Sequence, residues 1–269
     1  MIDSKWVLRI KKNSAGEIDK YKARLVARGF TQIYGIDYYE TYAPVARLAS
    51  FRIILAIAAR NGWPVHSFDF DSAYLNSKFE EDEAIYIEQP PGYETKDCKE
   101  WVWRLWKALY GLKQGARNWY KALCEVLNKL GFIRIEADHA VFLKRVGSIL
   151  IILAVHVDDC AVTGNSMATI ETFMKEIHMI YKITDTGPAS WLLGIKISRD
   201  LVNRTLSLSQ HAYVKAIITK YNFNDLKPLA IPIDPAVPLS KSQCPTKLED
   251  ISRMKNVPYW GSAMPVKKV

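Results

Sequence analysis

Two adjacent carboxylates, Asp158 and Asp159, interrupt an otherwise apolar stretch of the chain, residues 150–164 (LIILAVHVDDCAVTG). Apolar residues flank the pair on both sides, which predicts two strands joined by a tight reversal at residues 156–159. Neighbouring ionised carboxylates repel each other, and partial burial raises that cost unless cations or hydrogen-bond donors compensate. The pair is therefore a candidate metal site, provided that another carboxylate joins it; the alternative is a turn in which Asp only suits the backbone.

A third carboxylate is available at Asp69. It lies near the end of VHSFDF, residues 65–70, a pattern typical of a buried strand, and a helix or turn could begin at Ser72. Because 89 residues separate Asp69 from Asp158, only the fold could bring the two carboxylates together.

The composition limits the class of protein. With 269 residues and 49% hydrophobic content, the chain can fill the core of one large domain or two modest ones. No apolar stretch approaches the ~20 residues of a membrane helix, and the N-terminus lacks a signal-peptide pattern, so we expect a folded, soluble protein inside the cell. The four cysteines are scattered without a CxxC pair, which argues against a zinc site and against a disulfide framework.

The net charge of +9 suits a polyanionic partner such as nucleic acid, although such an excess can also be only a solvated surface. The charge is uneven along the chain. Residues 1–60 carry eleven Lys and Arg against five acids, whereas residues 69–100 carry ten acids against three Lys. We therefore expect these two segments to meet different partners.

The basic N-terminal segment predicts a β-hairpin, with strands over residues 6–10 and 21–27 and a turn at residues 13–16. Lys22 and Arg24 would lie on one face of the second strand. That face could hold a phosphate chain; the alternative is an edge strand protected from aggregation by its basic residues.

The remaining elements form a scaffold. A helix is expected over residues 50–60, with Ser50 as its N-cap. Three further segments have apolar residues at helical spacing and are expected to be helices: 115–130, 166–181 and 209–221. Ser166 and Ser209 are the expected N-caps of the last two. Strands are expected over residues 191–197 and 205–208. From Pro228 onward the chain holds seven of its twelve prolines and loses apolar periodicity, so we expect an extended or disordered tail.

Gln114 and Gly115 stand at the entrance of the helix expected over residues 115–130. A polar side chain and a glycine there allow close approach by a base or a ribose; otherwise they are ordinary loop residues. Three tryptophans precede this helix and could stack on bases, although core or interface packing is the alternative: Trp101, Trp103 and Trp106.

Taken together, several strings resemble the reverse transcriptase region of copia-type retrotransposon polyproteins. They follow in unbroken order over roughly residues 5–240: YKARLVARGFTQ (21–32), FDFDSAYLN (68–76), IYIEQPPGY (85–93), LYGLKQGARNWY (109–120), VDD followed by TG (157–164), and LLGIKI followed by LSQ. An ordered set of this length is far more specific than any single motif.

The resemblance implies an α+β, right-handed polymerase fold with fingers, a palm whose antiparallel sheet is backed by helices, and a partial thumb. The corresponding ranges are residues 1–64 for an N-terminal fingers-like part, 65–200 for the palm with a fingers insertion around 77–118, 201–227 for the start of the thumb, and 228–269 for a Pro-rich tail at the onset of the connection.

The resemblance also implies a two-metal site. Asp69, Asp158 and Asp159 would bind two Mg²⁺ ions, with the backbone carbonyl of Phe70 as a further ligand and Mn²⁺ as a possible substitute. Mg²⁺ prefers carboxylate, phosphate and water oxygens. Two ions roughly 4 Å apart stabilise both the attacking 3′-hydroxyl and the departing pyrophosphate.

Other residues take dNTP-binding and primer-binding roles by the same resemblance. Tyr74 would exclude a 2′-hydroxyl by bulk, Gln114 and Gly115 would lie beside the ribose and template base, and Lys22 and Arg24 would hold the triphosphate. Leu193 and Gly194 resemble the primer grip. Lys182 is a less favoured candidate for a general acid toward pyrophosphate.

The sequence departs from the family pattern in three places. His156 stands where the family usually has an aromatic residue, normally Tyr, and we expect it to pack or hydrogen-bond rather than to bind metal. Residues 114–117 (QGAR) replace the more usual small residue and proline before arginine. Residues 258–264 (PYWGSAM) resemble the onset of the connection to ribonuclease H, so that domain and the integrase are expected to be missing.

The predicted function is RNA-directed and DNA-directed DNA synthesis by phosphoryl transfer, with a template and primer and dNTPs as partners and no membrane. The expected location is intracellular, in a cytoplasmic virus-like particle with a possible nuclear stage. The alternative is a catalytically weak or dead remnant that only binds nucleic acid through its basic fingers. A phosphatase or nuclease using the same three acids is a third, unsupported hypothesis.

Overall fold

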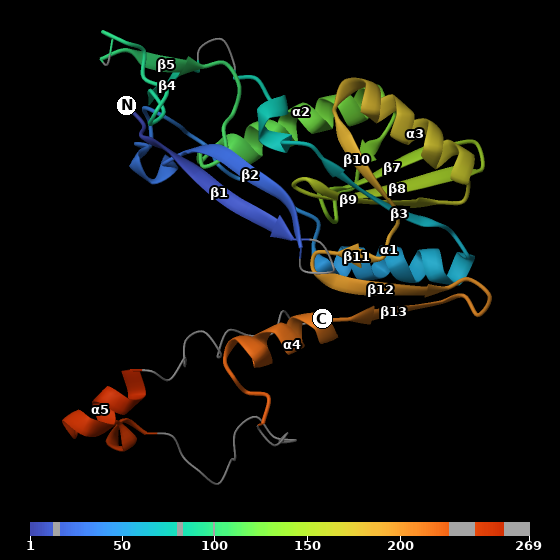
Figure 1. Ribbon diagram of the computed structural model, residues 1–269. Coiled ribbons are helices and arrows are strands. Elements are labelled where there is room, and N and C mark those ends of the chain that lie inside the picture. Colours follow the sequence, from blue (N-terminus) through green and yellow to red (C-terminus); the bar gives the residue numbers. More distant parts are fainter. Residues whose placement is uncertain (13–16, 80–82, 99, 226–239, 256–269) are drawn as a thin grey trace. The chain divides into compact units, whose positions relative to one another are not determined.

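A six-stranded antiparallel sheet, here called the central sheet, is the largest sheet among the residues that the computed structural model describes (Figure 1). These residues are 1–12, 17–79, 83–98, 100–225 and 240–255. The strand order of the central sheet is β10-β3-β9-β8-β7-β6. The bounds are β3 Val65–Phe70, β6 Ile133–Arg134, β7 Val141–Val146, β8 Ile149–His156, β9 Asp159–Gly164 and β10 Ile183–Pro188. The expected strand 65–70 and the expected hairpin at residues 156–159 are both confirmed.

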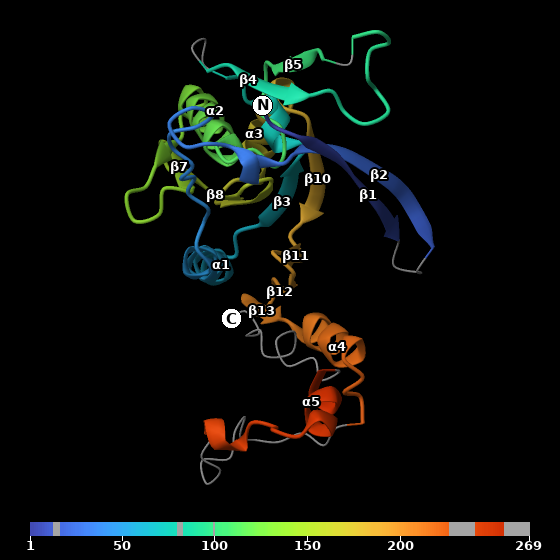
Figure 2. The same cartoon turned by 90° about the vertical axis from the view of Figure 1, so that its left-hand side faces the viewer.

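Helices cover both faces of this sheet (Figure 2). Ile151, Leu153 and Val155 of β8 join one core with α2 (Gly115–Lys129) and α3 (Met167–Ile180). The alternate residues Ile152 and Ala154 are buried on the opposite face, where α1 (Leu48–Asn61) contacts β8 and β9. Burial on both faces explains why residues 150–155 are continuously apolar rather than alternating.

The expected helices are present, but two N-caps differ from the prediction. The residue before α1 is Arg47 rather than Ser50, and α4 (His211–Lys220) begins after Gln210 rather than Ser209. Ser166 does cap α3, since its hydroxyl accepts a hydrogen bond from Thr169 N. None of the described helices is long and apolar enough to cross a membrane.

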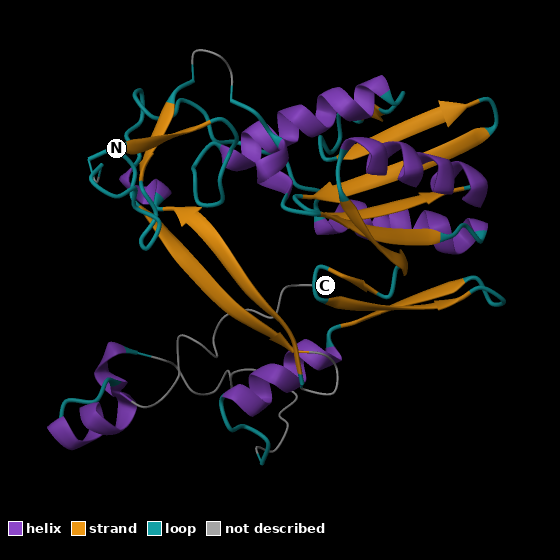
Figure 3. Cartoon of the chain, turned by 45° about the horizontal axis from the view of Figure 1, so that its top comes forward, coloured by secondary structure: helices purple, strands orange, loops and turns teal. Residues whose placement is uncertain are grey.

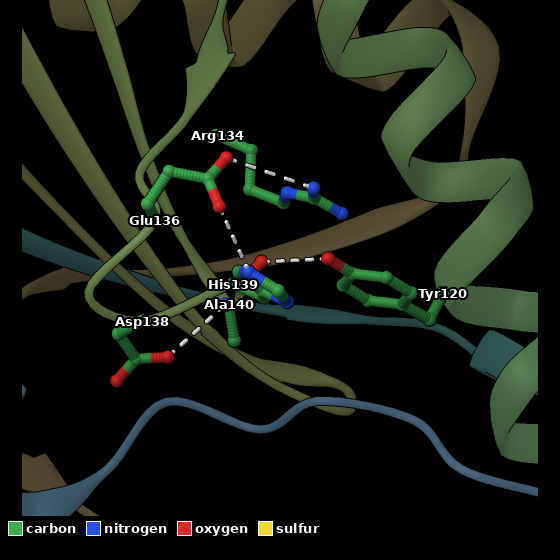
Figure 4. Close-up of polar contacts among 6 residues, drawn as sticks. All are labelled: Tyr120, Arg134, Glu136, Asp138, His139 and Ala140. Carbon is green, nitrogen blue, oxygen red and sulfur yellow. Dashed lines mark hydrogen bonds and ion pairs between the residues drawn. The ribbon is translucent and has the colours of Figure 1, made fainter.

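The start of α1 is tied to a loop far along the chain. The Asp138 carboxylate accepts hydrogen bonds from Arg47 N (2.9 Å) and from Ser50 Oγ (2.5 Å). Asp138, a residue outside α1, therefore accepts the hydrogen bond at the helix start that Ser50 was expected to accept. Asp138 also accepts from Ala140 N in its own loop, as Figure 4 shows. Burial raises the pKa of Asp138, but these hydrogen bonds lower it overall.

Two hairpins lie outside the central sheet. β1 (Ser4–Lys12) pairs with β2 (Ile18–Ala27), as expected although longer, and Figure 3 shows this pair as two long strands; the expected turn at 13–16 lies outside the described residues. β4 (Ile85–Glu88) pairs with β5 (Val102–Leu105). The tryptophans in and around β5 are not core residues, because Trp101, Trp103 and Trp106 are 60%, 40% and 71% exposed.

The C-terminal part differs from expectation in two ways. The single strand expected over 191–197 is broken by a turn at Leu193–Gly194 into β11 (Trp191–Leu192) and β12 (Ile195–Asp200), which form a sheet with β13 (Thr205–Ser209). The tail, expected to be extended or disordered, contains a 3₁₀ turn at Lys241–Gln243 and helix α5 (Leu248–Lys255). Its other parts, 228–239 and 256–269, lie outside the described residues.

The chain divides into two compact units. One comprises residues 1–193 and 198–206, and the other comprises residues 194–197 and 207–269. The first unit holds the central sheet, α1 to α3 and both hairpins.

We expect Asp138→Ala to lower the free energy of unfolding by about 1–3 kcal/mol, because it leaves partly buried donors at the start of α1 without their acceptor. Urea denaturation followed by circular dichroism measures this. Glu136→Ala is the matched control in the same loop. The Glu136 side chain is 86% exposed, and its contacts among the described residues are surface ion pairs with Arg134 and His139 (Figure 4). Equal losses in the two variants would contradict the assignment.

Candidate active site

Strand pairing brings the three predicted carboxylates together. In the β3–β9 register Asp69 lies directly opposite Asp159, and in the β8–β9 hairpin His156 lies opposite Asp159, which leaves Asp158 in the turn. Phe70 N donates a 3.0 Å hydrogen bond to Asp158 O, which ties the turn to the end of β3. The fold therefore supplies the partnership that the sequence separation left open.

The turn that carries Asp158 has a strained backbone, and α2 holds it. Val157 has φ of 65°, a conformation that a β-branched residue rarely adopts. The indole Nε1 of Trp119 donates a 2.9 Å hydrogen bond to Val157 O. Trp119 is itself buried against the rings of Phe70 and Tyr181, at 5.0 and 5.1 Å between centroids. A rigid aromatic core thus supports the strained turn.

Burial and neighbouring charge raise the pKa of two of the carboxylates, Asp69 and Asp159. Partial burial, followed by the charges of Asp158 and Asp159, raises the pKa of Asp69 to about 6. Partial burial and Asp158 also raise the pKa of Asp159, although His156 lowers it. Carboxylates with raised pKa values that lie close together are typical of functional sites, because such a group does not stabilise the fold.

The donor set fits a hard divalent cation. Among the described residues no group of three or more His, Cys, Asp or Glu side chains is arranged as a ready metal cage. Magnesium sites that act on phosphates use one or two carboxylates and take their other ligands from substrate and water, so a preformed cage is not required. The mutual repulsion around Asp69 is the kind of cost that a bound cation removes.

The hairpin strand β2 brings cations toward the carboxylates. Lys22 lies close enough to Asp69 for each to affect the other's pKa. Burial is the largest cause lowering the pKa of Lys22, followed by the neighbouring Arg24. The guanidinium of Arg24 lies 5.5 Å from the ring centroid of Tyr110. Both predicted phosphate-binding residues therefore lie on the side of β2 that faces the site.

Tyr74 lies just past the end of β3, in the 3₁₀ turn Ala73–Asn76. Its ring is half-buried, and burial followed by the charge of Asp158 raises the pKa of its hydroxyl. A Cβ atom on Gly115 would lie 3.9 Å from the Tyr74 ring, so the predicted pair Tyr74 and Gly115 are neighbours.

The side chain of Gln114 is buried in a hydrogen-bond network and does not reach into an open site. It is 2% exposed, and its Nε2 donates to Asp37 O (2.8 Å) and to Glu83 Oε1 (3.1 Å). Its Oε1 accepts from Gln32 Nε2 at 2.9 Å. The structure thus assigns Gln114 a part in a buried network at the entrance of α2, and sequence reasoning missed Gln32 and Glu83 as its partners.

Sequence reasoning also missed Asp71. Its carboxylate accepts a 2.7 Å hydrogen bond from Thr184 Oγ1 and forms a 3.2 Å ion pair with Lys182 Nζ. These contacts, led by the Thr184 hydrogen bond, lower the pKa of Asp71. The alternation Asp69-Phe70-Asp71 was the available signal, because it places two acids on one side of the end of β3.

Leu193 and Gly194 form the turn between β11 and β12, with φ of 52° and 79°. Gly194 tolerates this conformation without cost, whereas Leu193 does not. The two residues therefore lie in a hairpin turn, and their role at a primer end stays a prediction.

We expect opposite effects on thermal stability from Asp69→Asn and Asp71→Asn in protein freed of divalent cations. A raised pKa means that ionised Asp69 costs stability above the unfolded-state pKa, so Asp69→Asn should raise Tm at pH about 7.5 and have little effect below pH about 4. The pKa of Asp71 is lowered, so its stabilising contribution is present at neutral pH and Asp71→Asn should lower Tm there. Differential scanning fluorimetry in EDTA measures both, and a lower Tm for Asp69→Asn at neutral pH would contradict this account.

Comparison with known proteins shows the family of the chain. The family described as reverse transcriptase (RNA-dependent DNA polymerase) matches residues 1–235. The chain is 37% identical over 256 residues to the retrovirus-related Pol polyprotein from transposon TNT 1-94 of Nicotiana tabacum, covering 95% of this chain and 19% of the polyprotein. It is 34% identical to the Pol polyprotein from transposon RE1 of Arabidopsis thaliana, covering 96% of this chain and 17% of the polyprotein.

Two further matches are more distant. A putative transposon Ty5-1 protein of Saccharomyces cerevisiae is 31% identical over 70% of this chain and 60% of its own length. The structure of apo telomerase from Candida tropicalis aligns over 77% of this chain and 55% of that chain with a TM-score of 0.32 and 10% identity, too low to carry an argument. The chain spans less than a fifth of the two plant polyproteins. By the family match and these relatives, the chain belongs to the reverse transcriptase (RNA-dependent DNA polymerase) family and is related to copia-type retrotransposon Pol polyproteins.

Proposed function

We propose that this chain synthesises DNA, adding dNTPs to a primer 3′-hydroxyl on an RNA or DNA template. The observation that carries the proposal is the register of β3 and β9, which gathers Asp69 and Asp159 beside the Asp158 turn. Lys22, on the hairpin, lies close enough to Asp69 for its charge to lower the pKa of that carboxylate. Clustered acids with an adjacent basic strand suit a reaction in which a triphosphate must be held and its charge balanced.

The proposed cofactor is a pair of Mg²⁺ ions, for which Mn²⁺ can substitute. Asp69, Asp158 and Asp159 would hold them, with the carbonyl of Phe70 as a further ligand. When bound, the ions supply charge stabilisation to the attacking and leaving oxygens. The hydrogen bond from Trp119 to Val157 O keeps the Asp158 turn in place for this task.

The triphosphate would lie along β2. Lys22 and Arg24 offer it two cations on one strand face. Burial is the largest cause of the lowered pKa of Lys22, and the neighbouring charge of Arg24 is the second. A bound anion would relieve the repulsion between these cations, as a cation would relieve the repulsion among the acids.

The sugar of the incoming nucleotide would meet Tyr74. The half-buried ring of Tyr74 excludes a 2′-hydroxyl by bulk, and the absence of a side chain at Gly115 leaves room beside it. Gln114 would act through its buried network, holding the start of α2 where Gly115 lies. Leu193 and Gly194 would position the primer end.

The finer architecture is part of the proposal. Residues 1–64 would act as fingers, 65–200 as palm with a fingers insertion around 77–118, and 201–227 as the start of a thumb. The central sheet with helices on both faces supports the palm assignment. The chain would work beside the ribonuclease H and integrase activities of a longer polyprotein, inside a virus-like particle in the cell.

The test is primer extension on poly-rA with oligo-dT, dTTP and Mg²⁺. We expect wild type to extend the primer and Asp158→Asn to lose at least about a thousandfold in rate, because charge stabilisation of several kcal/mol is removed. Asp185→Asn is the matched control, an exposed acid on β10 next to β3, and it should retain activity.

If the wild-type chain shifts a primer–template duplex in a salt-dependent way but extends nothing, the polymerase proposal fails. The chain is then a nucleic-acid-binding remnant, and the histidine at position 156 is the first residue to examine.

A further inference from the structure

The ring of Tyr110 lies between two residues of the proposed nucleotide site and has no assigned role. Its centroid lies 4.6 Å from that of Tyr74, with the planes tilted by 45°. The guanidinium of Arg24 lies 5.5 Å from the same ring. Tyr110 thus contacts both the residue proposed to meet the sugar and a residue proposed to meet the triphosphate.

The backbone at Tyr110 is fixed against β2. Ala27 N, at the end of β2, donates a 2.8 Å hydrogen bond to Tyr110 O. A Cβ atom at Gly111 would lie 2.0 Å from Ala27 O, and one at Gly29 would lie 2.0 Å from Gly111 O. Only glycines permit two backbones to cross this closely. The crossing ties Tyr110 to the strand that carries Arg24.

The ring of Tyr110 also reaches toward the carboxylates. Burial is the largest cause raising the pKa of its hydroxyl, and the charge of Asp158 is the second, as for Tyr74. Both rings therefore border the same acidic turn. Tyr74 has one such aromatic neighbour among the described ring contacts, and that neighbour is Tyr110.

We propose that Tyr110 is a positioning residue for sugar discrimination: its ring holds the Tyr74 ring in place and links it to the phosphate-binding strand through Arg24. The inference rests on the proposed function. Without the Tyr110 ring, Tyr74 gains room to move away from the sugar, and a ribonucleotide meets less steric resistance. The hydroxyl of Tyr110 is not required, because packing against Tyr74 uses the ring.

The test compares kcat/KM for dTTP with that for UTP in primer extension by the full chain. We expect Tyr110→Leu to lower this ratio by about tenfold, because an aromatic pair contributes on the order of one tenfold step. Tyr110→Phe should keep the wild-type ratio. Tyr86→Leu is the control, since Tyr86 is an exposed tyrosine on β4, paired with Arg104, and should leave the ratio unchanged.

A double-mutant cycle separates positioning from general destabilisation. In a Tyr74→Val background, Tyr110→Leu should not lower the ratio further. Equal loss of kcat/KM for both nucleotides, with an unchanged ratio, would overturn the inference while leaving the polymerase proposal intact. If Tyr110→Leu does not fold by circular dichroism, Tyr110→Met, whose flexible side chain fills the space without a ring, takes its place.

If the chain does not extend primers, the inference is tested by nucleotide binding instead. The affinities of dTTP and UTP for the protein with primer–template are then measured in Ca²⁺, and the same variants should change the ratio of the two affinities in the same direction. A wild-type chain that extends no primer overturns the proposed polymerase function, and one that also binds neither nucleotide overturns this inference with it.

Discussion

The interaction on which the site depends is the antiparallel pairing of β3 with β9, because it sets two carboxylates, Asp69 and Asp159, opposite each other. Like charges in directly opposed positions destabilise a sheet. Burial is the largest cause of the raised pKa of both groups, and the charge of Asp158 is the second in each. The remainder of the sheet must outweigh the cost of gathering these acids. This pairing gives up some stability and gathers negative charge at the end of β3, where the proposed cations would bind.

Burial of apolar residues on both faces of the central sheet offsets the cost of gathering the carboxylates. Continuous apolar residues in β8 and β9 pack against α2 and α3 on one face and α1 on the other. The same packing also positions the turn that carries Asp158. Trp119 is a core residue, and its indole donates a hydrogen bond to the strained turn at Val157. Core and site are therefore not separable here, and a change in the aromatic core would be felt at the carboxylates.

Sequence patterns predicted the elements better than their ends. Apolar spacing located α1, α2 and α3, but Ser50 was misjudged as a cap because its hydroxyl serves Asp138, which lies 88 residues away. Trp101, Trp103 and Trp106 show the same limit, since aromatic residues predict burial and these are exposed. The sequence singled out Gln114 as a candidate ligand-binding residue. Its hydrogen bonds to Gln32 and Glu83 join three separate segments, so no local pattern predicts them.

By itself the sequence determined the chemistry available: three acids, a basic strand, an aromatic at position 74, and the ordered motifs that identify the family. Residue type and local periodicity are properties of short segments, so they can be seen without a fold. Only the tertiary structure decided which groups meet: Asp69 with Asp159, Asp71 with Lys182, and Tyr110 with both Tyr74 and Arg24. Those contacts arise from strand register and from close backbone crossings, which depend on residues far apart in the chain.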